Sequence, residues 1–380
     1  METKKCRFDE VTINFDKKRI PLSSAQREKR QGTFRYYGAQ GVIDHVDDYI
    51  FDGTYLLIAE DGENLKSKKQ NIAQVVDGQF WVNNHAHIVQ GNEQCDTRFL
   101  CYLINSMDLS GYVTGSAQPK LSQANLNAVT LSLPTLAEQK RIVEYLYMLD
   151  QKIDVNRQIN DNLEQQAQSY FQELFVDNAN PEWTTGTISD LGAVVGGSTP
   201  SKAKPEYYTE SGIAWITPKD LSINKSKFVS HGENDITELG LKNSSAAIMP
   251  EGTVLFSSRA PIGYIAIAAG EVTTNQGFKS VVPKPEIGTP FVYFFLKNTL
   301  PVIEGMASGS TFKEVSGSTM KNVPAVIPDA ETLAKFSDFC APIFAQQRIL
   351  EEQNQSLATL RDNLLPKLMS GEIDVSAVQL

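Results

Sequence analysis

Two short motifs contain residue types that could do chemistry. His85-Ala86-His87 supplies two imidazoles, which are common zinc ligands, but no Cys, Asp or Glu nearby in the sequence completes a tetrahedral set. Ser258-Arg259 pairs a hydroxyl with an orienting cation, but no His stands in a motif that could activate this hydroxyl as a nucleophile. We interpret the histidines as ordinary strand and turn residues, and the sequence predicts neither a metal site nor a nucleophilic centre.

Loops with catalytic signatures are also missing from the sequence. Residues 196–201 read Gly-Gly-Ser-Thr-Pro-Ser and lack the Gly-Lys-Ser/Thr ending of a phosphate-binding P-loop. Asn180-Pro181-Glu182 is not the Asn/Asp-Pro-Pro-Tyr/Phe loop that adenine methyltransferases carry. The sequence also lacks helicase motifs and a nuclease pattern of paired carboxylates with a lysine. The chain is therefore predicted to bind rather than to catalyse.

The charge of the chain is distributed unevenly. The formal net charge is −10, and residues 135–178 and 329–374 each hold 4 Lys/Arg against 8 Asp/Glu. Between Lys17 and Arg35, by contrast, seven basic residues accompany a single acidic one. Pro21, the two serines and Gly32 make most of residues Lys17–Gly32 a predicted loop. A solvated basic loop is the simpler interpretation, and contact with nucleic-acid phosphates is the functional one.

Two long helices are predicted, because one helical pattern occurs twice in the sequence. These helices are the elements that must position the loops. An offset of 194 residues maps Asn160 onto Asn354, and Leu133-Pro134 onto Ile327-Pro328. The sequence is therefore a tandem duplication of a globular segment followed by a long helix. In the first helix, spacings of alternately four and three residues define a heptad seam. Its members are Ile142, Leu146, Leu149, Ile153, Asn156, Asn160, Leu163, Ala167, Tyr170 and Leu174.

Two such helices can pack antiparallel through their seams. About 40 residues give a rod of about 60 Å, and an Asn within an apolar seam costs stability but can determine the register. The alternative is that each helix packs only on its own globular segment. The residues predicted to pair the helices are Leu146, Leu149, Ile153, Asn160, Leu163, Ile343, Leu350, Asn354 and Leu357.

Length and composition predict a two-domain soluble protein. The 380 residues are 41% hydrophobic and 21% charged. No apolar run approaches the roughly 18 residues that span a bilayer, and the first residues do not resemble a signal peptide. The four cysteines lack metal-ligand spacing. We expect them to be thiols in a reducing cytoplasm.

Several stretches resemble the specificity (S) subunit of type I restriction–modification systems, and the resemblance covers nearly the whole chain. The start of the first long helix, Leu133 to Ile142, is among the most typical stretches, whereas the second copy, Ile327 to Leu333, lacks its Glu-Gln-Lys. The other matching stretches lie at residues 20–24, 36–39, 49–53, 60–64, 197–200, 215–221, 258–263 and 275–277. Their order, together with the repeat, is specific to this family.

The resemblance implies an α+β fold. Two target-recognition domains, each a small mixed α/β globule, would be joined by two long antiparallel helices in a pseudo-two-fold arrangement. The predicted segments are residues 1–133 (first recognition domain), 134–178 (central helix), 179–327 (second recognition domain) and 328–380 (C-terminal helix).

The resemblance also implies a non-catalytic DNA sequence-specificity subunit. Each domain would read one half of a bipartite, asymmetric target in double-stranded DNA, while the helices set the spacer and dock two methylation subunits. Restriction subunits complete the complex, and S-adenosylmethionine, with ATP and Mg²⁺ for restriction, is expected in these partner subunits and not in this chain. Two alternatives stay open: an enzyme, as a fused methyltransferase or nuclease, and a coiled-coil scaffold without a DNA role.

The candidate DNA-contacting residues are polar, basic or aromatic side chains in or beside turns that flank predicted strands. Arg can form two parallel hydrogen bonds with a guanine edge, and Lys and Ser can bond phosphate oxygens. The candidates are Arg19, Ser23, Arg27, Lys29, Tyr36, Tyr37, Asn64, Lys120, Ser198, Thr199, Thr217, Lys219, Ser258, Arg259, Asn275 and Gln276.

Overall fold

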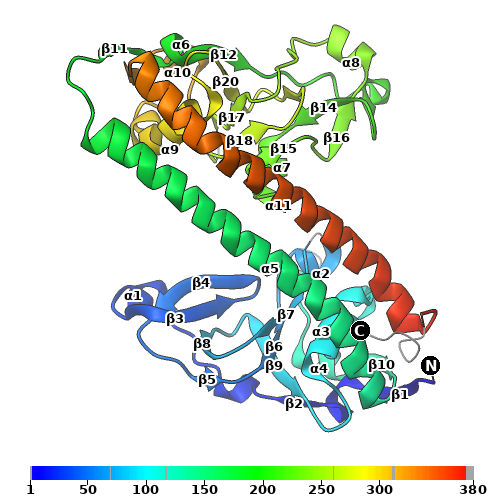
Figure 1. The fold of residues 1–380 in the computed structure, drawn as a ribbon. Coiled ribbons are helices and arrows are strands. Elements are labelled where there is room, and N and C mark those ends of the chain that lie inside the picture. Colours follow the sequence, from blue (N-terminus) through cyan, green and yellow to red (C-terminus); the bar gives the residue numbers. More distant parts are fainter. Residues whose placement is uncertain (1, 69, 116–117, 260, 310–312, 374–380) are drawn as a thin grey trace. The chain divides into compact units, whose positions relative to one another are not determined.

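The chain folds as two units that each contain a globular domain and one half of both long helices (Figure 1). Unit 1 comprises Met1–Ile153 with Ser356–Leu380, and unit 2 comprises Asp154–Gln355. The α+β class is confirmed. The computed structural model describes residues 2–68, 70–115, 118–259, 261–309 and 313–373. The ends of two predicted segments, Met1 and residues 374–380, lie outside these residues.

In the described part of unit 1, the strands form two four-stranded sheets and one two-stranded ribbon. The antiparallel sheet has the order β2-β9-β6-β7, with β2 Thr12–Asn14, β9 Ala86–Gly91, β6 Tyr55–Ala59 and β7 Ala73–Val76. The mixed sheet has the order β4-β3-β8-β5, with β4 Gly41–Val46, β3 Gln31–Gly38, β8 Gln79–Val82 and β5 Phe51–Asp52. The ribbon pairs β1 Lys4–Arg7 with β10 Thr130–Leu133.

Helix α3 (Thr97–Ser106) packs against the antiparallel sheet of unit 1. The Asp96 carboxylate caps its first turn by accepting hydrogen bonds from the backbone N–H groups of Arg98 (2.9 Å) and Phe99 (3.0 Å). Apolar side chains four residues apart, such as Phe99 and Leu103, lie on one face of the helix and pack into the core of the unit. The described part of the unit also contains the short helices α1 Ser24–Glu28, α2 Asn64–Ser67 and α4 Gln123–Asn127, and the 3-10 turns η1 Phe8–Glu10, η2 Asp16–Lys18 and η3 Ser110–Tyr112.

The described strands of unit 2 also form two sheets and a ribbon. The larger sheet has the order β12-β20-β17-β18-β15, with β12 Gly192–Gly196, β20 Lys279–Pro283, β17 Val254–Phe256, β18 Ile265–Ala268 and β15 Phe228–Val229. The smaller has the order β13-β16-β14-β19, with β13 Tyr208–Thr209, β16 Asn234–Ile236, β14 Ile213–Ile216 and β19 Thr273–Thr274. The ribbon pairs β11 Thr184–Thr187 with β21 Pro324–Ile327.

An aromatic core attaches helix α9 (Thr289–Gly305) to the long helices of unit 2. The ring of Phe294 lies 5.9 Å from that of Phe171 on the first long helix and 6.0 Å from that of Phe336 on the second. These fully buried rings join the large sheet and both helices in one core. The short helices of the unit are α6 Ile188–Leu191, α7 Pro218–Ile223, α8 Glu238–Lys242 and α10 Gly317–Lys321.

The elements repeat at the offset of 194 residues, which confirms the duplication. It carries α4 onto α10 and β10 onto β21 without a gap, and the two long helices start at Leu136 and Ala330. Their caps use different residues at matching positions. The Thr135 hydroxyl accepts from the Glu138 backbone N–H (3.4 Å), whereas the Asp329 carboxylate accepts from the Thr332 backbone N–H (2.9 Å). The second helix start can therefore lack the Glu-Gln-Lys sequence and still be capped.

The long helices α5 (Leu136–Gln172) and α11 (Ala330–Ser370) pair in antiparallel direction within each unit (Figure 1). In unit 1, Asp150 accepts a bond from Arg361 (2.6 Å), and in unit 2 Asn156 donates to Asn354 (2.9 Å). All ten predicted seam positions are buried or half-buried, nine of them on α5 and Leu174 in the π-helical turn that follows it (Glu173–Asp177). No described helix is both long and apolar enough to cross a membrane.

The residues predicted to pair the helices lie at the expected inward positions. Leu146, Ile153, Ile343 and Leu350 are buried, and Leu149, Asn160, Leu163, Asn354 and Leu357 are half-buried. The Asn160 side chain reaches across unit 2 to the Gln347 carbonyl oxygen (3.2 Å), and the Gln347 amide returns a bond to the Asn160 carbonyl oxygen (3.1 Å). The alternative in which each helix packs only on its own globular segment is therefore wrong.

The prediction that Lys17–Gly32 is mostly loop was only partly correct, because this segment contains helix α1. Ser23 caps α1 by accepting a bond from the Gln26 backbone N–H (3.3 Å), while the Gln26 side chain accepts from the Ser23 backbone N–H (2.8 Å). This reciprocal cap starts a helical turn despite the nearby Pro and Ser residues.

Candidate nucleic-acid interface

A cleft of 540 Å³ in unit 2 brings together five of the candidate residues. They come from three separate parts of the sequence: the loop after β12, the start of α7 and the turn after β19. The cleft is lined by Thr199, Lys202, Tyr208, Trp215, Thr217, Pro218, Lys219, Asp220, Glu233, Asn234, Asn275 and Gln276.

One wall of the cleft is the junction between β14 and α7. Thr217 precedes the first turn of α7, and its backbone N–H and hydroxyl both donate to the Asp220 carboxylate at 2.7 Å. The other oxygen of Asp220 accepts from the Glu233 backbone N–H (2.9 Å), which ties α7 to the segment before β16. Pro218 at the first helical position suits this sharp start. These bonds tie the wall together, and Lys219 leaves it as an exposed side chain paired with Glu233.

The turn after β19 lines the cleft beside this wall. The backbone N–H of Asn275 donates to the Ile216 carbonyl (3.0 Å), and its side-chain oxygen accepts from the Gly277 backbone N–H (2.8 Å). Gln276 stands at the tip, where the Thr199 hydroxyl donates to its side-chain oxygen. Amide and hydroxyl groups arranged in this way can both donate to and accept from base edges.

Two aromatic residues hold the loop after β12 against the smaller sheet. The Trp215 indole N–H donates to the Ser198 carbonyl (3.0 Å), and the Tyr208 hydroxyl donates to the Pro200 carbonyl (2.6 Å). The two rings meet edge to face at 5.7 Å. Thr199, between the two anchored residues, is thereby placed opposite Gln276. Sequence reasoning missed Tyr208 as a cleft residue; its local signal is the Tyr207-Tyr208 pair at the start of β13.

Three other candidates of unit 2 lie outside the cleft lining. Ser258 is fully buried and its hydroxyl donates to the Gly277 carbonyl (3.2 Å), so it supports the Asn275–Gly277 turn from inside and offers no surface to DNA. The Ser198 hydroxyl accepts from the Ser245 backbone N–H (3.3 Å). Arg259 is half-buried beside Ser258, and its backbone forms a β-bridge with Glu314.

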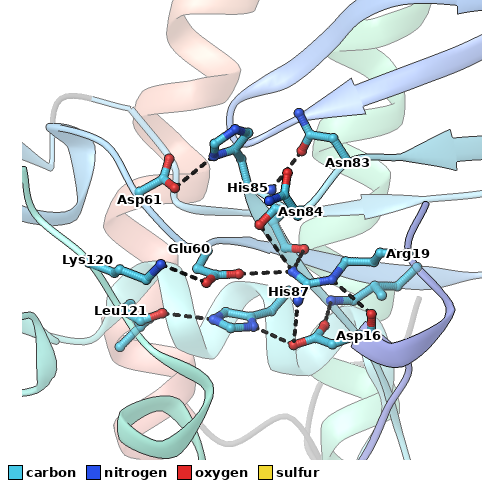
Figure 2. A network of polar contacts seen from close by, with 12 residues as sticks. Asp16, Arg19, Glu60, Asp61, Asn83, Asn84, His85, His87, Lys120 and Leu121 are labelled. Atoms are coloured by element: carbon cyan, nitrogen blue, oxygen red, sulfur yellow. Dashed lines mark hydrogen bonds and ion pairs between the residues drawn. The ribbon is translucent and has the colours of Figure 1, made fainter. Parts of the chain in front are cut away.

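Unit 1 contains a polar network centred on Arg19 and His87 (Figure 2). The Arg19 guanidinium donates to the Glu60 carboxylate (3.0 Å) and the Ala86 carbonyl (2.7 Å), and its side chain is only 15% exposed. Lys120 forms an ion pair with the other Glu60 oxygen at 3.1 Å. Burial alone would raise the pKa of Glu60, but the bonds from Arg19 and Lys120 lower it. The Arg19 side chain is therefore bonded to groups within unit 1, whereas the Lys120 side chain is 53% exposed.

Both histidines of the first motif belong to this network. His87 is buried between the Asp16 carboxylate (2.6 Å) and the Leu121 carbonyl oxygen (2.8 Å), and His85 lies at the surface beside Asp61 (2.8 Å). The sequence placed no carboxylate near them, but the fold brings two. Among the described residues, no three His, Cys, Asp or Glu side chains gather in a way that could hold a metal ion.

The segment Lys17–Arg35 is less basic in space than its sequence suggests, because several of its arginines pair with carboxylates. Arg27 pairs with Asp44 (2.8 Å) and Arg30 with Asp47 (2.8 Å), and both carboxylates stand on or just after the neighbouring strand β4. The charge count along the sequence did not reveal these partner carboxylates. The hairpin of β3 and β4 brings them beside arginines that lie 17 residues away in the sequence. Lys29, which follows α1, is exposed and is the candidate of this segment that is best placed for a phosphate contact.

Most of the remaining candidates of unit 1 are buried within the unit. Tyr36 is fully buried and its hydroxyl accepts from the Leu22 backbone N–H (2.8 Å), while Tyr37 is 4% exposed. The Asn64 side chain, 8% exposed, bonds Gln70 within the α2 region (3.2 Å). These burials leave little surface for DNA. Ser23, as the cap of α1, stays exposed.

Comparison with known proteins identifies the family. The model of the "Type I restriction modification DNA specificity domain" matches residues 3–165 and 180–360. The MjaIX specificity subunit of Methanocaldococcus jannaschii is 39% identical over 191 residues, which cover 48% of this chain and 44% of that protein. The HindI specificity subunit of Haemophilus influenzae is 24% identical over 404 residues, covering 85% of this chain and 84% of that protein.

A solved structure shares the fold. The S subunit of the type I restriction–modification system from M. genitalium superimposes with a TM-score of 0.56 at 16% identity, covering 97% of this chain and 96% of the other. The family model covers most of this chain in two consecutive copies, one in each half of the duplication. The chain therefore belongs to the type I restriction–modification DNA specificity family.

Proposed function

We propose that the chain reads DNA for a type I restriction–modification complex and has no catalytic activity of its own. The observation that carries the proposal is the cleft of unit 2, where Thr199, Lys219 and Gln276 meet with two other predicted residues. Amide groups suit base edges and Lys suits phosphates. Family membership supports the recognition role.

Each unit reads one half of a bipartite target in double-stranded DNA. The two recognition domains are copies of one fold with different side chains, so the two half-sites differ and the target is asymmetric. The paired helices α5 and α11 set the spacer between the half-sites, and their acidic outer faces dock two methylation subunits.

The chemistry belongs to the partner subunits. The sequence carries no methyltransferase, P-loop or helicase motif, so we assign S-adenosylmethionine to the methylation subunits, and ATP and Mg²⁺ to restriction subunits where these are present. The assembled complex works in the cytoplasm, where it meets DNA.

The test is DNA binding by the chain co-purified with its methylation subunits. We expect a marked preference for one bipartite sequence over scrambled duplexes, an affinity that falls as salt rises, and adenine methylation at mapped sites. Gln276→Ala should weaken the preference, whereas Gln123→Ala, an exposed glutamine on α4, should not. Equal affinity for all duplexes would reject the proposal, and methyl transfer by the isolated chain would favour the enzyme alternative.

A further inference from the structure

The turn Asn83–His85 of unit 1 has the same hydrogen-bond pattern as the turn Asn275–Gly277 that borders the cleft of unit 2. In each turn the backbone N–H of the first Asn donates at 3.0 Å to a strand carbonyl, that of Tyr37 in unit 1 and that of Ile216 in unit 2. The side-chain oxygen of that Asn then accepts a bond of 2.8 Å from the backbone N–H two residues later. Both turns follow a strand that runs parallel to its neighbour, β8 beside β3 and β19 beside β14.

The surroundings of the two turns also correspond. The last carbonyl of the turn accepts from the Glu60 backbone N–H (2.9 Å) in unit 1 and from the Ser258 backbone N–H (2.8 Å) in unit 2. The next residues, Asp61 and Arg259, form β-bridges with positions 120 and 314, which are 194 residues apart. The two turns therefore occupy matching places in the two copies of the duplicated fold.

The side chains at these matching places differ. Where unit 2 has Gln276, Gly277 and Arg259, unit 1 has Asn84, His85 and Asp61. His85 is 53% exposed, and its Nδ1 lies 2.8 Å from the Asp61 carboxylate. A carboxylate accepts only, so Nδ1–H donates to it and the ring is held in one orientation. In the described part of the chain Nε2 has no hydrogen-bond partner, and in the neutral form of the ring Nε2 is an acceptor.

Arg19 supports this turn from beneath (Figure 2). Its guanidinium donates to the carbonyl oxygen of Ala86 (2.7 Å) and lies 3.5 Å from that of Asn84. The Glu60 carboxylate holds the guanidinium in place from the other side (3.0 Å). Arg19 was a candidate for DNA contact, but these bonds make it a positioning residue for the turn above it.

We propose that the Asn83–His85 turn is the base-reading element of unit 1, with His85, oriented by Asp61, accepting a hydrogen bond from the exocyclic amino group of adenine or cytosine. In the major groove these amino groups are the only donors on the base edges. The inference rests on the proposed function, because it names the side chains through which unit 1 recognises its half-site.

The test uses the full chain in complex with its methylation subunits and a duplex series in which each base pair of the target is replaced in turn. His85→Ala should reduce discrimination roughly 5- to 150-fold at one base pair of a single half-site, and His85→Gln should retain part of it. Gln276→Ala should act on the other half-site only. Gln123→Ala is the matched control, an exposed side chain of unit 1 away from the turn.

A modified base tests the hydrogen bond itself. At the affected position, adenine replaced by purine, or cytosine replaced by 2-pyrimidinone, lacks the amino group. This replacement should weaken binding by the wild-type complex and leave the His85→Ala complex unaffected. Asp61→Ala and Arg19→Ala should each reduce the same discrimination without moving it to another position.

Two outcomes would overturn the inference. In one, His85→Ala leaves every base preference intact or weakens all duplexes equally, as loss of a phosphate contact would. In the other, the affected base is one without an amino donor in the major groove. Failure of the proposed function looks different, because the wild-type complex would then show no sequence preference at all.

Discussion

Asn156 of α5 donates its side-chain amide to the side-chain oxygen of Asn354 of α11 at 2.9 Å, within the interior of the helix pair. Asn156 is fully buried, and its own side-chain oxygen has no partner among the described residues. A buried polar atom without a hydrogen bond destabilises the fold. The pair therefore lowers the stability of the fold but defines the register between the helices.

We expect the double substitution Asn156→Leu and Asn354→Leu to raise the free energy of unfolding by about 1 kcal/mol. At the same time the helix register should become less well defined, which would appear as methylation at sites with more than one spacer length. Urea unfolding and sequencing of methylated sites measure the two effects. Gln151→Leu, on an exposed position of α5, is the control. A less stable double variant would contradict this account.

The length of the helix pair should set the spacer of the DNA target. Inserting four residues after Gln158, and four after the matching Glu352, adds about one helical turn, or roughly 6 Å, to both rods. Four residues nearly preserve the phase of the seam. Methylation mapping should reveal the same half-sites with a spacer about two base pairs longer. An unchanged spacer with full activity would disprove the ruler. Inserting into α5 alone should disturb the pairing and lower stability.

A buried charge cluster connects β15 to the long helices of unit 2. The Lys227 ammonium contacts the Glu164 carboxylate and donates to the Gln347 side-chain oxygen (2.6 Å), with only 7% of its side chain exposed. Burial lowers the pKa of Lys227, whereas the Glu164 charge acts in the opposite direction. Lys227→Ala would leave Glu164 with one ion-pair partner fewer in a poorly solvated place.

The Lys227→Ala substitution is expected to cost about 3 to 5 kcal/mol of unfolding free energy. Lys227→Ala with Glu164→Gln should recover part of the loss, because the uncompensated charge is gone. Lys321→Ala removes an exposed lysine of the same unit and should cost little. Denaturant unfolding of the three variants is the measurement, and equal losses for Lys227 and Lys321 would refute the role of the cluster.

The Asp16–His87 pair should make unit 1 sensitive to acid. Burial alone would raise the pKa of Asp16, but bonds from His87 (2.6 Å) and the Ile88 backbone N–H (2.8 Å) bring it below its ordinary value. The folded-state pKa is therefore lower than the unfolded value of about 4. The stabilisation is present above that pH and is lost as the pH falls through the folded-state pKa.

At neutral pH, Asp16→Asn should reduce the free energy of unfolding by about 1 to 3 kcal/mol. The difference from wild type should shrink as the pH is lowered below about 4. Urea unfolding at a series of pH values measures this difference in unfolding free energy. Glu93→Gln, which changes an exposed carboxylate, is the control. A difference that stays constant at all pH values would argue against the pair.

Arg259 stays a candidate for base contact in unit 2. It lies beside the Asn275–Gly277 turn, and its guanidinium can form two hydrogen bonds with a guanine edge. We expect Arg259→Ala to weaken binding of the cognate duplex more than binding of a scrambled one, by about 1–3 kcal/mol. Lys202→Ala, at the rim of the cleft, should weaken both equally. Equal losses for Arg259→Ala would assign it to a phosphate.

The sequence by itself determined the repeat and everything that depends on local periodicity. The offset of 194 residues found the starts of α5 and α11, and the spacing of four and three found the seam that contains Leu146 and Ile153. Such features are readable because helix periodicity and capping involve residues only a few positions apart.

Tertiary structure alone decided which polar groups are available to DNA. Arg19 and Arg27 look like free cations in the sequence, but the fold supplies Glu60 and Asp44, which lie 41 and 17 residues away. The role of His85 likewise depends on a strand pairing that sets it beside Asp61. A side chain's partners follow from contacts between distant segments, and no local pattern encodes these contacts.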